Sequence, residues 1–313
     1  MSITWNDSLD RFLAHVRAKG RSSYTLRNYT ADLRRFAEWW SLDPNRQELT
    51  PSSITEYDLE GFSLYLQDQA LGKDDRTGQK PATVNAKLSA VRSYLTWAVK
   101  LKHITEVPQC EPVTREEDEP KGLERTEELA LIRTVAAGRK KRDLAIFEIE
   151  LNTGVRVAEL VAICWRDVEM TANKGTLTIR AGKGRKWRTV PLNKTARKAF
   201  TVLKTLAGGR VHPDWHVFKS QREHGDLSAR GVESMVARYG GKAGLPGLHP
   251  HVLRHTYAYR LIDEGVDIAT IARLLGHRSV QTTMRYLRRR EGSLQAAVDK
   301  LDSVRLAHPH PAR

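Results

Sequence analysis

Cysteine is scarce in this sequence. The chain has only Cys110 and Cys164, which lie far apart and belong to no CxxC pair. A disulfide framework needs several paired cysteines, and a thiolate zinc site needs closely spaced ones. Both classes are therefore excluded, and the two thiols are expected to be structural.

Long apolar runs are also missing. No stretch approaches the roughly 18 apolar residues that span a membrane. The amino-terminal residues MSITW are not a basic region followed by an apolar one, so they do not predict a secretion signal. We expect a soluble, cytoplasmic protein that makes no membrane contact.

Acidic residues are in deficit. Asp and Glu total 37 against 52 Lys and Arg, which gives a net charge of +15. Almost all of the excess lies in residues 113–313, with 37 basic and 23 acidic residues, whereas residues 1–112 have 15 and 14. Hydrophobic residues make up 40% of the chain, which excludes a disordered tail. The net positive charge favours a polyanionic partner. Because residues 1–112 are nearly neutral, they could bind nucleic acid only through one basic face.

The spacing of apolar residues divides the chain into two domains. Residues 1–107 hold four segments with apolar positions three and four apart, which predict helices. Residues 108–121 combine prolines with an acidic run and predict an extended, mobile linker. The chain from residue 122 to residue 313 forms the second predicted domain.

The second domain mixes helical and strand-like patterns. Alternation at Leu177 and Ile179, and again over residues 188–192, predicts two strands joined by a basic, glycine-containing hairpin at residues 181–186. Helical spacing dominates the remainder. We expect a mainly helical α+β fold with a small sheet.

Five short clusters in the second half carry polar side chains suited to chemistry. They are TGVR with Arg156, GKG with Lys183, HVLRH with His251 and Arg254, LGH with His277, and RYL with Tyr286. Each has an ordinary interpretation. Arg156 could pair with Glu159, Lys183 could be a solvated turn residue, His277 could follow a helix end at Gly276, and Tyr286 could pack in a core. A phosphate-binding P-loop is excluded, because GxxxxGK[ST] is absent.

The histidines of HVLRH permit two interpretations. His251 and His255 are four residues apart and could bind a metal, but no carboxylate or thiolate with ligand-like spacing accompanies them. His251 and Arg254 are three residues apart and so share a helix face. An imidazole beside a guanidinium is suited to a phosphate oxygen. We therefore favour phosphate chemistry over a metal site.

In this order, the clusters resemble the motifs of the tyrosine recombinase, or phage integrase, family, in its Xer-like branch. The HxLRH box and the nine-residue step from His277 to Tyr286 match that family, while TGVR stands where TGLR is commoner. The resemblance covers almost the whole chain. It implies a four-helix, SAM-like core-binding domain at residues 1–107 and a catalytic domain with a C-terminal tail helix at residues 122–313.

The resemblance also implies a role for each motif residue. Tyr286 would attack a DNA phosphodiester and form a 3′-phosphotyrosyl link, which conserves the bond energy for rejoining. The other implied roles are as follows: Arg156 and Arg254 bind the phosphate oxygens, His251 accepts the tyrosine proton, Lys183 protonates the leaving 5′-oxygen, His277 hydrogen-bonds the phosphate, and Glu159 orients the arginine site. Tyr239, Tyr257 and Tyr259 compete as nucleophiles in principle.

Neither metal nor cofactor is implied. Five basic residues are further DNA-binding candidates: Arg27, Arg34, Lys87, Arg92 and Arg185. The expected partner is double-stranded DNA with inverted-repeat half-sites. A dimer would bind each site and a tetramer would form in synapsis, built either from copies of this chain or together with a related recombinase. An apolar stripe in the tail, Leu294, Val298 and Leu301, predicts docking onto a neighbouring protomer. On DNA the protein would be associated with the nucleoid.

Two other functions remain open at this point. A type IB topoisomerase shares the tyrosine, the arginines, the lysine and the histidine, but it relaxes single duplexes. A non-catalytic regulator could use residues 268–287 as a helix-turn-helix. The biological role also stays open among chromosome-dimer resolution, phage integration, and transposon or plasmid resolution.

Overall fold

The chain forms two compact units, Met1–Glu117 and Asp118–Arg313, in a computed structural model. The structure describes residues 4–68, 78–114, 121–180, 187–220, 225–277 and 279–287. The predicted hairpin turn at 181–186, the linker residues 115–120 and the tail after residue 287 lie outside these ranges. No helix in the described ranges is long and apolar enough to cross a membrane.

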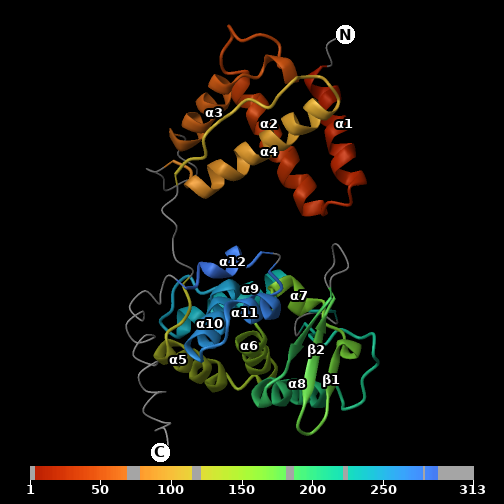
Figure 1. The fold of residues 1–313 in the computed structure, drawn as a ribbon. Helices are drawn as coiled ribbons and strands as arrows, with labels where there is room; N and C mark the ends of the chain where they lie inside the picture. The colour runs from red at the N-terminus through yellow and green to blue at the C-terminus, as the bar shows by residue number, and fades with distance from the viewer. Residues whose placement is uncertain are drawn as a thin grey trace, which may run out of the picture. The chain divides into compact units, whose positions relative to one another are not determined.

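The first unit is built from four α-helices: α1 (Trp5–Ala18), α2 (Ser23–Trp40), α3 (Glu56–Asp68) and α4 (Pro81–Lys100), with a short 3-10 turn, η1 (Pro51–Ser53) (Figure 1). The Ser22 side chain caps α2 by accepting from the Thr25 N–H, and Pro81 opens α4, as the sequence predicts. The core is rich in aromatic rings; those of Phe36 and Phe62 meet edge to face at 5.0 Å.

The beginning of the predicted linker packs against this helical unit. Cys110 is buried in its core, and the Asn85 amide makes two 2.9 Å hydrogen bonds with the backbone of Val113. Through these contacts, Cys110 and Val113 belong to the first unit although they follow its last helix. The described residues 108–114 have no helix or strand.

The second unit is mainly helical around a small sheet. Its helices are α5 (Arg125–Ala137), α6 (Lys141–Thr153), α7 (Val157–Val161), α8 (Lys194–Leu206), α9 (Ala229–Lys242), α10 (Pro250–Asp263), α11 (Ile268–Leu275) and α12 (Gln281–Met284), with the 3-10 turn η2 (Trp165–Asp167). The strands β1 (Val168–Met170), β2 (Gly175–Ile179) and β3 (Arg188–Pro191) form an antiparallel sheet in the order β1-β2-β3. The mainly helical α+β prediction is confirmed.

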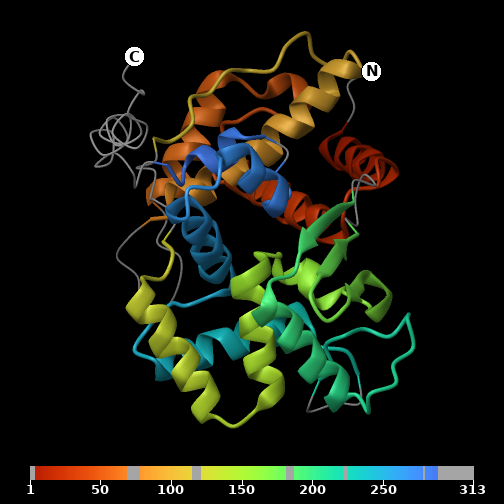
Figure 2. The same cartoon turned by 60° about the horizontal axis from the view of Figure 1, so that its bottom comes forward.

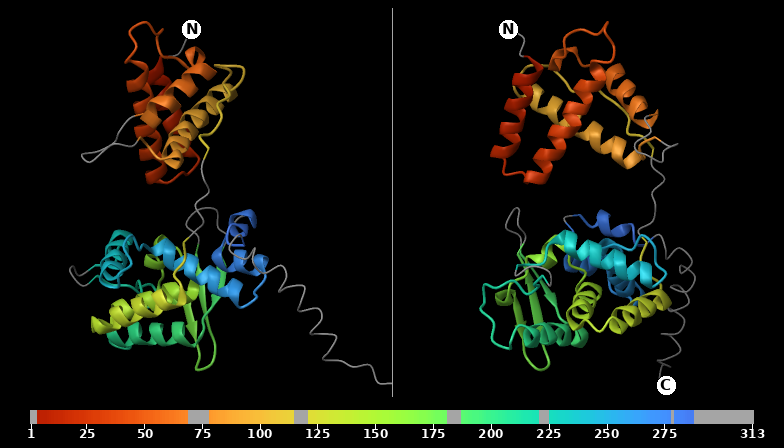
Figure 3. Two further views of the ribbon diagram at one scale, coloured as in Figure 1. Left: turned by 90° about the vertical axis from the view of Figure 1, so that its left-hand side faces the viewer. Right: turned by 180° about the vertical axis from the view of Figure 1, so that it is seen from behind.

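The helix α6 lies at the centre of this unit, where α8 and α10 pack against it (Figure 2). Its buried residues include Ile146, Phe147 and Leu151, which belong to the main hydrophobic core. At one end of the unit, α7, the end of α11 and α12 gather where β2 ends and β3 begins (Figures 1 and 3). This end collects most of the motif residues.

Candidate active site

A glycine with a left-handed backbone conformation precedes Arg156 and sets its position. Gly154 ends α6 at φ 59°, and a Cβ there would meet the ring of Tyr257 at 2.3 Å. Only glycine fits both the backbone and the close ring. The chain then turns into α7 with Arg156 as its N-cap residue, and the Arg156 N–H donates to Glu159 Oε2 at 2.9 Å.

Glu159 holds Arg156 through its side chain as well. Arg156 Nη1 donates to Glu159 Oε1 at 2.9 Å, and its Nη1 and Nη2 lie 3.4 Å from the carbonyl oxygens of Leu275 and Gly276. The pairing with Glu159 that the sequence suggests is present. It leaves the arginine side chain 37% exposed, so Arg156 remains accessible to a ligand.

The side chain of Arg254 also contacts the C-terminal end of α11, from the buried side. Its side chain is buried; Nη2 donates to the Leu275 carbonyl at 2.6 Å, and Nη1 donates to the Gly154 carbonyl. Burial, followed by repulsion from Arg156, lowers the pKa of Arg254 to about 10, so the guanidinium stays charged at neutral pH. Two positive groups therefore converge on Leu275.

His277 follows directly from this helix end. Gly276 caps α11 at φ 66°, and the His277 N–H returns to the Ala272 carbonyl at 3.0 Å, so the glycine C-cap expected from the sequence is present. The imidazole Nδ1 lies 2.7 Å from Thr283 Oγ1. Burial, followed by the positive charges of Arg254 and Arg156, lowers the pKa of His277 to about 4, which leaves a neutral imidazole beside the two arginines.

Tyr286 is buried at the edge of this cluster. Its side chain is 2% exposed, and its hydroxyl lies 2.7 Å from His255 Nδ1. Burial raises the pKa of Tyr286, while the charges of Arg254, Arg285 and Arg156 act in the opposite direction. The phenol is therefore protonated in this arrangement and lies within the electrostatic influence of both motif arginines.

The competing tyrosines have packing roles in the structure. Tyr239 donates from its hydroxyl to Asp143 at 3.1 Å, deep in the unit. Tyr257 is buried against Gly154, and Tyr259 meets the Tyr286 ring edge to face at 5.3 Å. The Tyr286 hydroxyl, in contrast, lies within hydrogen-bond distance of a histidine of the HVLRH box.

His251 lies one turn before His255 on α10 and is exposed. Its ring centre is 6.2 Å from that of His255, and the hydrogen bond to Tyr286 involves His255 instead. Partial desolvation and the charge of Arg254 lower the pKa of His251. Within the described part of the chain, no group of three His, Cys, Asp or Glu side chains could hold a metal ion.

The DNA-binding candidates of the first unit differ in their surroundings. Arg27 and Arg34 are exposed on α2, and Arg92 is half-buried on α4. Lys87 pairs with Asp32 at 3.2 Å, so its charge is partly offset. Lys183 and Arg185 lie outside the described residues.

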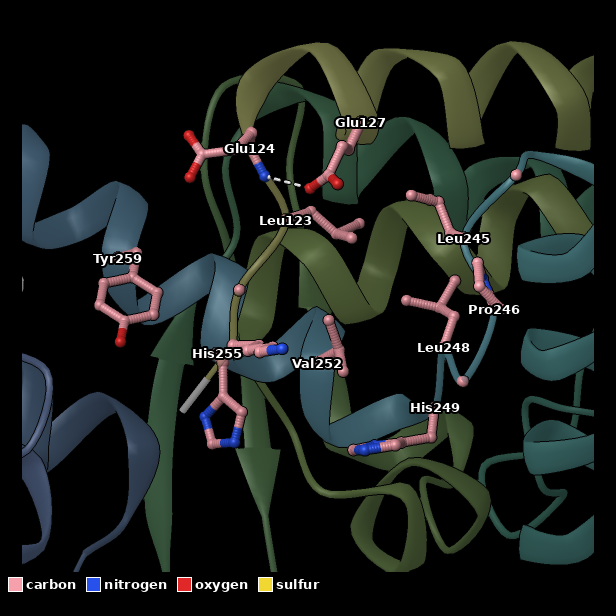
Figure 4. Close-up of a pocket in the computed structure, with 14 residues that line it drawn as sticks. Leu123, Glu124, Glu127, Leu245, Pro246, Leu248, His249, Val252, His255 and Tyr259 are labelled. Atoms are coloured by element: carbon pink, nitrogen blue, oxygen red, sulfur yellow. Dashed lines mark hydrogen bonds between the residues drawn. The ribbon is translucent and has the colours of Figure 1, made fainter. Parts of the chain in front are cut away.

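A pocket of about 850 Å³ lies beside the HVLRH helix. His255, Val252 and Tyr259 from α10 line it, together with residues 244–249 and the start of α5 (Figure 4). Glu124 and Glu127 stand at its edge, joined by the hydrogen bond from the Glu124 N–H at 2.8 Å. Carboxylate, imidazole and apolar side chains therefore share the lining of this pocket.

Two residues of the arrangement are not predicted from the sequence. There His255 stands out only as a possible metal ligand with His251, although its side chain contacts Tyr286. Arg188, the first residue of β3, makes a bidentate ion pair with Glu159 at 2.9 and 2.7 Å. The HxxxH spacing placed His255 one turn from His251 on the motif helix, whereas nothing local in the sequence marked Arg188.

Comparisons with known proteins agree with this architecture. The phage integrase family matches residues 121–292, and the N-terminal SAM-like domain of phage integrases matches residues 9–102. The tyrosine recombinase XerC of Corynebacterium glutamicum is 30% identical over 307 residues, which cover 96% of this chain and 91% of that protein.

Two solved structures have a similar fold. The XerH site-specific recombinase bound to its difH substrate before cleavage has a TM-score of 0.69 at 22% identity, covering 91% of this chain and 83% of that one. A lambda integrase tetramer bound to a Holliday junction has a TM-score of 0.68 at 19% identity, covering 91% and 77%. Since the two family models together match most of the sequence, the chain belongs to the phage integrase family of tyrosine recombinases.

Proposed function

We propose that this protein is a site-specific DNA recombinase that cleaves and rejoins DNA with Tyr286 as its nucleophile. The observation that carries the proposal is the convergence of Arg156 and Arg254 on the Leu275 carbonyl, at the helix end that leads through His277 to Tyr286. Tyrosine recombination is also what the names of its relatives state.

The cleavage step transfers a phosphoryl group without net loss of bond energy. The Tyr286 oxygen would form a bond to the scissile phosphorus as the bond to the 5′-oxygen breaks, leaving a 3′-phosphotyrosyl link and a 5′-hydroxyl. Attack by a 5′-hydroxyl on that link reverses the bonds and releases the tyrosine. Because the energy is kept in the link, rejoining needs no nucleotide cofactor.

The two arginines suit the charge of this step. The pentavalent phosphorus places additional negative charge on its non-bridging oxygens, and preorganised cations offset that charge. Arg156 is partly exposed and Arg254 is held rigidly by two carbonyl groups. Neutral His277 would donate a hydrogen bond to the same phosphate. Lys183 would protonate the leaving 5′-oxygen.

The proton of Tyr286 has two proposed acceptors. The family resemblance favours His251, whereas His255 is the imidazole within hydrogen-bond distance of the hydroxyl, at 2.7 Å. Burial, followed by the charges of His251 and Arg254, lowers the pKa of His255 to about 4, so its ring is neutral and can accept a proton at pH 7. We favour His255 as the first acceptor on this geometry.

DNA and further recombinase subunits are the partners of this enzyme. We propose in addition that the DNA site has inverted-repeat half-sites, each bound by one protomer, and that two such sites form a tetramer. Arg27 and Arg34 would contribute backbone contacts from the first unit, since both are exposed on α2. The proposed location is the nucleoid.

Strand exchange between two differently labelled duplexes tests the function. In the presence of EDTA, we expect products that join a strand of one duplex to the other, because the proposed site uses arginine rather than a metal to offset charge. Rejoining of each duplex only to itself would favour the topoisomerase. Binding without any covalent adduct would favour the regulator.

A further inference from the structure

Arg188 occupies a junction between the sheet and the arginine cluster. It opens β3 and pairs with Ile179 at the end of β2, so it stands at the base of the hairpin whose connecting residues include Lys183. Its Nε donates to the Leu274 carbonyl of α11 at 3.0 Å. Its two terminal nitrogens donate to the two oxygens of Glu159 at 2.9 and 2.7 Å.

Glu159 is shared between two arginines. Besides the two bonds from Arg188, it accepts from the Arg156 side chain and from the Arg156 N–H, each at 2.9 Å. Burial alone would raise the pKa of Glu159, but the hydrogen bonds from Arg188 and Arg156 lower it to about 2. The side chains of Arg188 and Glu159 are 14% and 15% exposed, so water screens this pair only in part.

The backbone at the end of α11 lies close to the Arg188 side chain. A Cβ on Gly276 would come within 2.7 Å of Arg188 Nη1. Arg188 therefore holds Leu274 while Arg156 and Arg254 donate to the next carbonyl, that of Leu275. A single guanidinium thus fixes both Glu159 and the helix end on which the two motif arginines converge.

We propose that Arg188 is a positioning residue for DNA cleavage, holding Glu159 and the end of α11 so that Arg156 keeps its place and its free positive charge. This inference rests on the proposed function. One carboxylate between two guanidinium groups leaves a net charge of +1. Without Arg188, Glu159 would neutralise Arg156 instead, and the phosphate would lose most of the attraction from that side.

The test compares single-turnover cleavage by wild type and Arg188→Gln at saturating protein on a nicked duplex that traps the adduct. We expect the variant to cleave at least about tenfold more slowly, with site-specific DNA affinity within about twofold of wild type. Arg188→Lys keeps the charge but cannot make the bidentate pair, so it should recover only part of the rate. Arg197→Gln removes another arginine bonded to a backbone carbonyl, at 2.9 Å from Leu192 O, and serves as the matched control with a near-wild-type rate.

A substrate with a methylphosphonate at the cleavage site separates positioning from general damage. Its phosphorus centre has lost the charged oxygen, so the charge of Arg156 matters less to its cleavage. The factor by which Arg188→Gln slows cleavage should shrink on this substrate. Adding Glu159→Gln to Arg188→Gln should recover part of the lost rate, because the neutral glutamine no longer offsets the charge of Arg156.

The outcomes distinguish this inference from the proposed function. Arg156→Ala and Tyr286→Phe are measured in parallel, and wild-type cleavage by either would overturn the proposed function itself. If both fail to cleave while Arg188→Gln cleaves at the wild-type rate, or is slowed equally on both substrates, the positioning role is refuted. If Arg188→Gln does not fold, the same comparison of substrates with Arg188→Lys decides the question.

Discussion

The hydroxyl of Tyr286 lies 2.7 Å from Nδ1 of His255 in a site where both groups are neutral. Burial raises the pKa of the phenol and, with the nearby charges of His251 and Arg254, lowers the pKa of the imidazole to about 4. The tyrosine side chain is only 2% exposed. Since a hydroxyl buried in this way is closed to a DNA phosphate, the proposed attack by Tyr286 requires the site to open first.

Replacing His255 tests whether its contact carries the tyrosine proton. His255→Ala and His255→Asn should each slow adduct formation by about 10²-fold or more while leaving DNA affinity unchanged, since general-base catalysis contributes at least that much. Asn keeps a polar group near the position of Nδ1 but cannot accept a proton. A wild-type rate for His255→Asn would show that the contact only holds Tyr286. Because the pKa of His255 is about 4, protonation of this residue should not slow the wild type between pH 7 and 5.5.

The general-acid role of Lys183 is tested by changing the leaving group. Lys183→Ala should slow cleavage of ordinary DNA, because the departing 5′-oxygen needs a proton. With a 5′-bridging phosphorothiolate, the sulfur leaves without one, so the loss should be substantially smaller. Measured single-turnover rates that fall equally on both substrates would remove Lys183 from this role.

Glu150 predicts a pH-dependent stability of the second unit. Both carboxyl oxygens are buried and have no hydrogen-bond partner among the described residues, and burial raises the pKa to about 8. As the pH rises from about 4.5, the unfolded chain loses this proton while the folded chain keeps it, so the free energy of unfolding falls until the pH passes about 8.

Glu150→Gln removes that titration. At pH 8 it should stabilise the unit by an amount on the order of a few kcal/mol, with little effect at pH 5, as thermal unfolding at both values would report. Glu169→Gln, at an exposed position on β1, should give the same small difference at both values. An unchanged pH dependence in Glu150→Gln would contradict the buried, protonated carboxyl.

The C-terminal tail, which lies outside the described residues, is predicted to join protomers. Truncation after Gly292 removes the apolar stripe of Leu294, Val298 and Leu301. Binding to one DNA half-site should be retained, while cooperative binding to a full site and tetrameric synapsis should weaken by about tenfold or more. A gel-shift titration on full and half-sites measures both effects. Unchanged cooperativity would refute the tail contact.

Local patterns predicted most of the fold. The helices of the first unit followed from apolar residues three and four apart, and Ser22 and Pro81 marked two of the starts. The strand β1 was missed, because its three residues are too few to show alternation. The pairing of Lys87 with Asp32 was also invisible, since 55 residues separate them in the chain.

Only those site residues that lie within a recognisable sequence motif could be predicted. The clusters around Arg156, Arg254 and Tyr286 could be read from the sequence because their order matches the family. Arg188 could not, since its function depends on the sheet that brings β3 to Glu159 and α11. The contact of His255 with Tyr286 joins residues 31 positions apart and depends in the same way on tertiary packing.

In the proposed mechanism, Tyr286 forms the covalent link to DNA. Tyr286→Phe removes one oxygen and keeps the ring that packs on Tyr259, so affinity for the site should stay near wild type. On a nicked suicide duplex, the short fragment with the 5′-hydroxyl diffuses away, and wild-type protein should accumulate as a 3′-linked adduct on a denaturing gel.

The decisive measurement is the amount of that adduct in wild type, Tyr286→Phe, Tyr257→Phe and Tyr259→Phe. We predict none with Tyr286→Phe and retained adduct with the other two variants. Adduct formed by Tyr286→Phe, together with its loss in Tyr257→Phe or Tyr259→Phe, would contradict the assignment of the nucleophile.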